Sequence, residues 1–515
     1  PAFSRCYKRS RQRFVRENEG MKLRVVAGLA AAVLWASAWA QAQPAEDWRA
    51  IAVQDVRAAY DIFVANHPGM HDPGNRAFPA QLARARDRAL ALAERAASRS
   101  DYAAALGTFS AGLGDGHAQV MMIQPPAGTQ ADREWPGFTV AWRGSALLVH
   151  QAGTGAPAPV GATITACNGR PIRDYLRQRL LTRNFRPAEA GQWWFWSTRA
   201  FVSTPTTVDG RPERCTFRSP GSRAREAALS WIAAPADLDA RLAAASDGER
   251  TPIGITEPRP GLFLVGMPDF NPDEAGAEAW RRLYEELARR RADLARARAL
   301  VVDLRHNNGG SSLWSRDAAR ILWGREAVDR RMARHFRDVA IWWRASRGNT
   351  EHMEDLIRRL EGMGRTAQAD ASRGSAQGMR AALDRGETFY VQPIDDDESP
   401  DAGGPLPATD FRTPVYVIVP GRCASACNDA LDVFTRFPNV RLIGAPGSGD
   451  STYMEARATE LPSGRGRIVI PNKIWMGRPR ASGEVYRPHV AVNELDWSTA
   501  TFLDRIERDF GSRRR

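Results

Sequence analysis

Long apolar runs and internal repeats are missing after residue 40, and lysine is almost absent there, with Lys473 as the only one. Without an unbroken apolar stretch of about 20 residues, no membrane span is predicted in this part of the chain. The scarcity of lysine leaves one candidate for any catalytic role that requires an amine. The chain nevertheless has 515 residues, of which 43% are hydrophobic and 9% aromatic. This is enough for two or three domains with cores of their own.

The first forty residues carry the pattern of an export signal. A basic start at Met21–Arg24 precedes an apolar run at Val25–Trp35 and an Ala-x-Ala site that ends at Ala40. This pattern is typical of a secretory signal peptide, here residues 21–40, cleaved after Ala40. We therefore expect a periplasmic or secreted protein in which residues 1–20 are a mis-called start. The alternative is a leader that stays uncleaved and anchors the protein.

Positive charge is concentrated in the expected leader. Residues 1–40 hold eight Lys/Arg and two Glu, a net +6 of the chain's +13. The remaining arginines are scattered along the sequence without interleaved aromatic residues. Such a distribution is more typical of a solvated surface than of a nucleic-acid interface. We predict no nucleic-acid partner.

Four cysteines lie beyond the leader, namely Cys167, Cys215, Cys423 and Cys427. An oxidising compartment permits disulfides, and four cysteines allow three connectivities. We favour pairing Cys167 with Cys215 and Cys423 with Cys427. Four buried thiols are the alternative.

The chain divides into three regions by pattern. Residues 45–125 show helical spacing of apolar positions, whereas residues 134–250 contain short strands bounded by glycine and proline. Residues 255–500 alternate strands with helices, which predicts an α/β sheet covered by helices. We interpret residues 325–410 as an insertion over one edge of that sheet.

Three short motifs follow one another along the chain. The first is Leu-Gly-Asp-Gly-His at Leu113–His117, and the second is Asp-Leu-Arg-His-Asn-Asn-Gly-Gly at Asp303–Gly310. The third is Cys-Ala-Ser-Ala-Cys at Cys423–Cys427, after the apolar run Val415–Val419. In this order, the motifs resemble those of the tail-specific (C-terminal processing) serine peptidases over most of residues 50–495. The region 134–250 resembles a degenerate PDZ-like module.

The resemblance implies a nucleophile and an oxyanion hole. Ser425 would follow a buried strand and open a helix, which presents its hydroxyl at the carboxyl end of the strand. The amide of Ala426 would then belong to a helix N-terminus, where N–H groups are unsatisfied and negative charge is favoured. Gly309 or Gly310 could supply a second N–H, because glycine allows close approach of substrate. The alternatives are a helix N-cap at Ser425 and a simple turn at the glycines.

One branch of the family that this chain resembles uses a lysine as the general base. The sequence argues against that branch here. The segment that would carry the lysine is Gly444–Asp450, which has Asp450 at the lysine position. A Ser–Lys dyad would have to use Lys473, outside the usual place.

The other branch, similar to the tricorn peptidases, uses a histidine with a carboxylate behind it. His117 fits the base, because imidazole can take and return a proton. Glu484 is the best match for the carboxylate, with Glu455 and Asp429 as substitutes. The alternative for His117 is a turn histidine that bonds a carbonyl.

The resemblance implies a crotonase-like (ClpP-like) α/β sandwich, preceded by the helical domain and the PDZ-like module. It implies an exported serine-type endopeptidase that acts on peptides or proteins, without metal or organic cofactor. A non-catalytic binder of peptides or lipids on the same scaffold is one alternative, since Asp450 and His489 depart from the family pattern. A small-acyl esterase or amidase is another.

Overall fold

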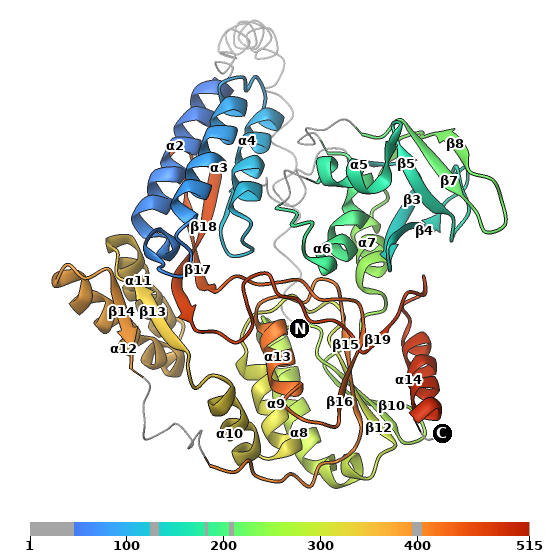
Figure 1. Cartoon of the computed structure of the whole chain (residues 1–515), viewed down its shortest axis with the longest axis vertical. Coiled ribbons are helices and arrows are strands. Elements are labelled where there is room, and N and C mark those ends of the chain that lie inside the picture. Colours follow the sequence, from blue (N-terminus) through green and yellow to red (C-terminus); the bar gives the residue numbers. More distant parts are fainter. Residues whose placement is uncertain (1–45, 124–132, 181–183, 205–210, 394–403, 514–515) are drawn as a thin grey trace, which may run out of the picture. The chain divides into compact units, whose positions relative to one another are not determined.

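The computed structural model describes five stretches of the chain, and the expected leader lies outside them: residues 46–123, 133–180, 184–204, 211–393 and 404–513. The described residues from Trp48 onward belong to one unit (Figure 1). Across the five stretches, no helix has the length and apolar character needed to cross a bilayer.

Helices open the described chain, as the spacing of apolar residues predicts for residues 45–125. They are α2 (Trp48–Asn66), the 3-10 turn η1 (Pro68–His71), α3 (Phe78–Ala93) and α4 (Arg99–Leu113). Ser98 caps α4 by accepting the N–H of Asp101, and Gly114 ends the helix with φ of 65°. A left-handed residue after a helix favours glycine. The end of α4 therefore delivers the chain directly into the segment that carries His117.

The region 134–250 is rich in short antiparallel strands, as predicted. The main sheet of this region consists of β3 (Phe138–Arg143), β4 (Ala146–Ala152), β5 (Thr163–Cys167), β6 (Arg170–Pro171), β7 (Arg214–Arg218) and β8 (Arg225–Ala228). Its other elements are β2 (Glu134–Trp135), α5 (Ile172–Arg179), α6 (Ala190–Trp196), η3 (Ser197–Phe201), β9 (Ile232–Ala233) and α7 (Leu238–Asp247). Cys167 and Cys215 face each other on β5 and β7 and form a disulfide, which confirms the first predicted pair.

A six-stranded sheet carries the second and third motifs. Its order is β10-β11-β12-β15-β16-β19, and all neighbours are parallel except β10 and β11. The strands are β10 (Gly254–Arg259), β11 (Leu262–Gly266), β12 (Ala299–Asp303), β15 (Val415–Val419), β16 (Val440–Gly444) and β19 (Val490–Ala491). Because parallel strands end at the same edge, β12 and β15 bring the glycine motif and Ser425 together.

Helices cover both faces of this sheet, as the alternation of strands and helices predicts (Figure 1). One face packs against α8 (Glu274–Ala295), α9 (Leu313–Trp323) and α13 (Ala426–Phe434). The other packs against α14 (Thr499–Arg513). Successive residues of a strand point to opposite faces, so Val417 joins the first core and Ile418 the second. An α/β fold with helices on both faces is confirmed.

The segment 325–410, expected to be an insertion, contributes two strands to a second sheet. Its strands β13 (Ala340–Arg344) and β14 (Phe389–Gln392) pair with each other, and β13 pairs with β18 (Gly466–Met476). The same long strand also pairs with β1 (Gln119–Met122) and β17 (Tyr453–Glu460). The helices of the segment are α10 (Arg325–His335), α11 (Arg347–Gly362) and α12 (Thr366–Asp384). Eleven-residue β18 makes this possible, because it is long enough to serve several partners along its length.

Candidate active site

Ser425 occupies a sharp turn between β15 and α13. Its backbone has φ of 55° and ψ of −130°, a conformation that costs free energy for a residue with a side chain. The buried disulfide Cys423–Cys427 brackets this turn, which confirms the second predicted pair. The turn places the Ser425 hydroxyl beyond the carboxyl end of a buried strand, as expected of a nucleophile on a strand-to-helix connection.

His117 reaches Ser425 from the other end of the sequence. Its Nε2 atom lies 3.4 Å from Ser425 Oγ, across 308 residues of chain. The Asp115 carboxylate accepts the backbone N–H of His117 at 2.8 Å and so fixes the loop after α4. The other ring nitrogen, Nδ1, is buried without a hydrogen-bond partner in the described chain. The ring therefore has one nitrogen directed at the serine and one nitrogen available.

Two buried carboxylates lie near the His117 ring. Asp115 Oδ1 is 3.9 Å from Nδ1, beyond hydrogen-bond distance, and burial raises the pKa of this aspartate. Burial would also raise the pKa of Asp450, but Arg480 and His117 act against it, so that the pKa is lowered. Asp450 is thus held ionised beside the pair.

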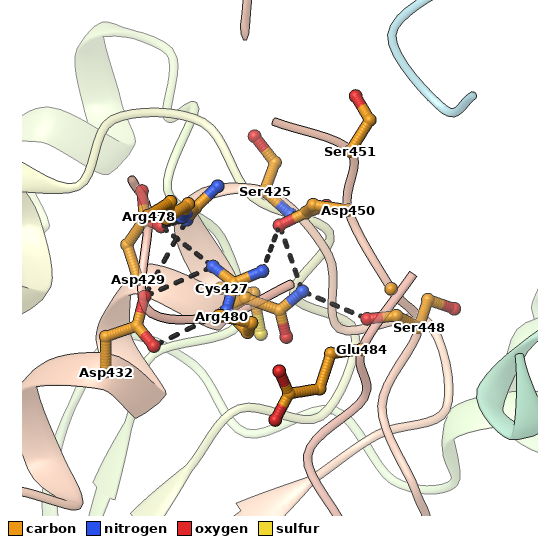
Figure 2. A network of polar contacts seen from close by, with 12 residues as sticks. Ser425, Cys427, Asp429, Asp432, Ser448, Asp450, Ser451, Arg478, Arg480 and Glu484 are labelled. Atoms are coloured by element: carbon orange, nitrogen blue, oxygen red, sulfur yellow. Dashed lines mark hydrogen bonds and ion pairs between the residues drawn. The ribbon is translucent and has the colours of Figure 1, made fainter. Parts of the chain in front are cut away.

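Asp450 bonds the backbone of the nucleophile. Its Oδ1 accepts the N–H of Ser425 at 2.7 Å, while Oδ2 accepts from Asn428 and from Arg480, each at 3.0 Å (Figure 2). The sequence identified Asp450 only as a departure from the lysine of the other branch. In the structure, this residue is a carboxylate that accepts a hydrogen bond from the backbone of the strained turn at Ser425.

Behind Asp450 lies a buried ion network (Figure 2). Arg480 also contacts Asp432 at 3.1 Å and Asp429 at 3.3 Å, and Arg478 contacts Asp429 at 2.5 Å. The aspartates come from α13 and the arginines from the loop after β18. The network thereby ties the helix that begins at the nucleophile to a segment some 50 residues further on. Charges this deeply buried are stable only when paired and hydrogen-bonded.

The candidate oxyanion donors adjoin Ser425, with one change from expectation. The N–H of Gly309 donates to Asn307 Oδ1 at 2.9 Å, so it is engaged. The N–H groups of Gly310 and Ala426 have no intramolecular partner among the described residues. A Cβ on Gly309 would lie 2.8 Å from both Ala424 O and Ser425 Cβ. Gly309 therefore allows close packing, and Gly310 and Ala426 are the available donors.

The expected carboxylate behind His117 is not brought to it. Glu484 is exposed, and its carboxylate accepts the N–H of Ala481 at 2.9 Å, which closes a turn of its own. Among the substitutes, Asp429 belongs to the ion network. Glu455 pairs with Lys473 at 3.1 Å. In the described chain none of these carboxylates contacts the imidazole.

Lys473, the alternative base, has other partners. Besides Glu455, its ammonium lies 4.4 Å above the ring of Trp343. It lines the same cavity as Ser425, yet the two share no hydrogen bond. His117 is therefore the basic side chain in contact with Ser425 Oγ within the described ranges.

Two cavities meet at Ser425 and His117. One has a volume of about 800 Å³ and extends past Gln192, Phe195 and Trp196. The other has a volume of about 650 Å³ and extends past Gly310, Ala426 and Lys473. The pair thus lies where the two cavities adjoin. The described residues contain no cluster of three or more His, Cys, Asp or Glu arranged to hold a metal.

Comparisons with known proteins concern the family and the fold. Residues 263–472 match the model of peptidase family S41. Mature CPAF in complex with lactacystin aligns with a TM-score of 0.56 and 15% identity, over 90% of this chain and 97% of that one. Mature CPAF alone gives 0.57 and 14%, over 89% and 97%. The photosystem II D1 C-terminal processing protease gives 0.36 and 14%, over 88% and 96%. No curated protein matches the sequence.

The family match covers strands β12, β15 and β16 of the sheet, the glycine motif, the Ser425 turn and the Asp450 segment. The likeness to mature CPAF extends the common fold over nearly the whole described chain. Residues 263–472 thus carry a peptidase domain of family S41.

Proposed function

We propose that the protein is an exported serine-type endopeptidase in which Ser425 attacks the substrate and His117 is the general base. The observation that carries the proposal is the 3.4 Å approach of His117 Nε2 to Ser425 Oγ. A distance at the long end of the hydrogen-bond range is common before substrate binds. The available amides of Gly310 and Ala426, which line the same cavity as Ser425, support the same assignment.

In the proposed reaction, Nε2 accepts the hydroxyl proton as Ser425 Oγ attacks the peptide carbonyl carbon. The N–H groups of Gly310 and Ala426 donate to the resulting oxyanion, which stabilises charge that exists only in the transition state. The imidazolium then protonates the leaving amine, and an acyl-serine forms. Water, deprotonated by His117, releases the acid and restores the serine. No step in this scheme requires a cofactor.

Two carboxylates compete for the role of orienting His117. The resemblance alone assigns this role to Glu484, whose carboxylate accepts the N–H of Ala481. Asp115 is closer to the ring and already accepts the backbone N–H of His117. We propose that Asp115 orients the loop, and that Glu484 contributes only if its turn rearranges. Replacing each by the matching amide separates the two roles, because the amide keeps the shape and removes the charge.

We also propose the finer organisation that the sequence indicates. Residues 255–500 would be the crotonase-like catalytic domain, 134–250 the PDZ-like module and 45–125 the helical domain. The leader would be removed after Ala40 and the protein delivered to the periplasm or medium. N-terminal sequencing of exported protein should then begin at Gln41. A cytosolic protein that still begins at residue 1 or 21 would contradict this.

Labelling with a fluorophosphonate tests the proposal, because the reagent modifies only an activated serine. The label should map to Ser425 and be lost in Ser425→Ala and His117→Ala. The crystallised complex of mature CPAF makes lactacystin a second probe. Folded protein that binds peptides but takes no label would favour the non-catalytic alternative. Hydrolysis of small esters without cleavage of any peptide would favour an esterase.

A further inference from the structure

The two cavities that meet at Ser425 differ in charge. The charged side chains that line the larger one are a single carboxylate, Asp450, and four arginines: Arg179, Arg186, Arg422 and Arg467. The smaller one is balanced, with two cations and two carboxylates: Arg316, Lys473, Asp429 and Glu455. We call the larger one the arginine cavity. The chain as a whole is rich in arginine, but its overall composition does not explain why one cavity has excess positive charge and the other does not.

Some of the charges in the arginine cavity are already compensated. Arg186 makes two bonds to the Glu189 carboxylate, at 2.5 and 3.0 Å. Asp450 is committed to Ser425 and Arg480. These groups therefore offer little to a ligand, and the sole carboxylate in the lining does not offset the other arginines.

Arg422 and Arg467 have donors to spare. Arg422 stands three residues before Ser425, stacks 4.8 Å from the Phe195 ring and reaches Asp247 only at 3.5 Å. Its Nε is buried without a hydrogen-bond partner among the described residues. Arg467, on β18, is exposed, and its guanidinium has no ion pair or hydrogen bond within the described chain. Two guanidinium groups thus border a cavity that ends at the nucleophile.

We propose that the arginine cavity is a subsite for an acidic side chain of the substrate, bound by Arg422 and Arg467. A guanidinium presents a planar set of donors that matches a carboxylate, and such charge-assisted bonds are stronger than neutral ones. The aromatic lining at Phe195 and Trp196 accommodates the methylenes of a glutamate. This inference rests on the proposed function and adds a preference for aspartate or glutamate on one side of the scissile bond.

Matched peptides test the preference. Peptides that carry glutamate at one position within three residues of the cleaved bond are compared with glutamine and lysine at the same position. Wild-type protein should cleave the best glutamate peptide with kcat/KM at least about tenfold above its glutamine twin. In the double variant Arg422→Gln/Arg467→Gln this ratio should fall to near one. Arg316→Gln, in the balanced cavity, is the matched control and should keep the ratio.

The outcomes separate the two proposals. Wild-type protein that labels at Ser425 and cleaves peptides without any preference for acidic residues would overturn the subsite and leave the peptidase standing. Failure of both labelling and cleavage would overturn the proposed function itself. Each peptide is also made with an amidated C-terminus. A loss of cleavage on amidation that is equal in the glutamate and glutamine peptides would assign the cavity to a terminal carboxylate and overturn the side-chain assignment.

Discussion

At the scale of single residues, the proposed chemistry depends on groups brought together from distant parts of the sequence. The roles of His117 and Ser425 were predicted from motifs that resemble those of a known family, and the structure brings the two side chains to 3.4 Å. The structural role of Asp450 was not predictable from the sequence. Its partners are the N–H of Ser425, the amide of Asn428 and the guanidinium of Arg480, and no local pattern links these groups. The place of Glu484 was not predictable either, since a turn can direct its carboxylate to its own backbone.

The bond from Asp450 to the Ser425 N–H predicts a graded response to substitution. Asp450→Ala removes the acceptor and should lower kcat by about 10²-fold with KM little changed, because small misplacement of a nucleophile is costly. Asp450→Asn keeps an oxygen at the same position and should retain more activity than Asp450→Ala. Steady-state kinetics measure this, with melting curves to show that both variants fold. Equal losses in both would show that charge, and not the bond to Ser425, is what matters.

At the scale of elements, the helices and the parallel strands followed from apolar periodicity, while the second sheet did not. Strand β18 pairs with β1, β13 and β17, which are separated from it by up to about 350 residues. Pairing at that range depends on the folded chain, and periodicity carries no information about it. Both disulfide pairs were predicted, although four cysteines and the expected export left three connectivities open.

The two disulfides should differ in what they support. Replacing Cys423 and Cys427 by alanine opens a short loop, worth about 2 kcal/mol by chain entropy. Because this loop contains Ser425, labelling of the serine should slow markedly. Replacing Cys167 and Cys215 opens a loop of 48 residues, worth about 4 kcal/mol. That variant should melt at a lower temperature yet label at the normal rate while folded. Labelling rates measured below both melting transitions decide this, and equal rates in the two variants would contradict it.

At the scale of the whole molecule, stability should depend on pH through His67. This histidine is fully buried, stacks on Phe78 at 4.2 Å and lies 4.9 Å from the ring of Tyr453, so it links the N-terminal helices to β17. Burial lowers the pKa of His67 to about 3 from an ordinary value of 6.5. Between these values the unfolded chain binds the proton and the folded chain does not. Above pH 6.5 His67 therefore does not reduce the free energy of unfolding. As the pH decreases from 6.5 toward 3, protonation of the unfolded chain lowers that free energy.

Substitution of His67 separates this contribution from other titrating groups. His67→Asn keeps an acceptor for the Gly69 N–H, which His67 Nδ1 accepts at 2.9 Å. The variant should be less stable at pH 7 but should lose less stability on acidification. Denaturant unfolding at pH 7 and pH 5 gives both quantities. A pH dependence equal to that of the wild-type protein would show that His67 does not contribute to it.

The most direct measurement of the central claim is peptide hydrolysis by single and double variants of the proposed relay. Ser425→Ala and His117→Ala should each lose at least about 10³-fold in kcat, and the double variant should be little worse, because relay residues act as a unit. Lys473→Ala is the control and should keep most activity, since its ammonium pairs with Glu455. If Lys473→Ala abolishes turnover while His117→Ala remains active, lysine is the base and the assignment of His117 is wrong.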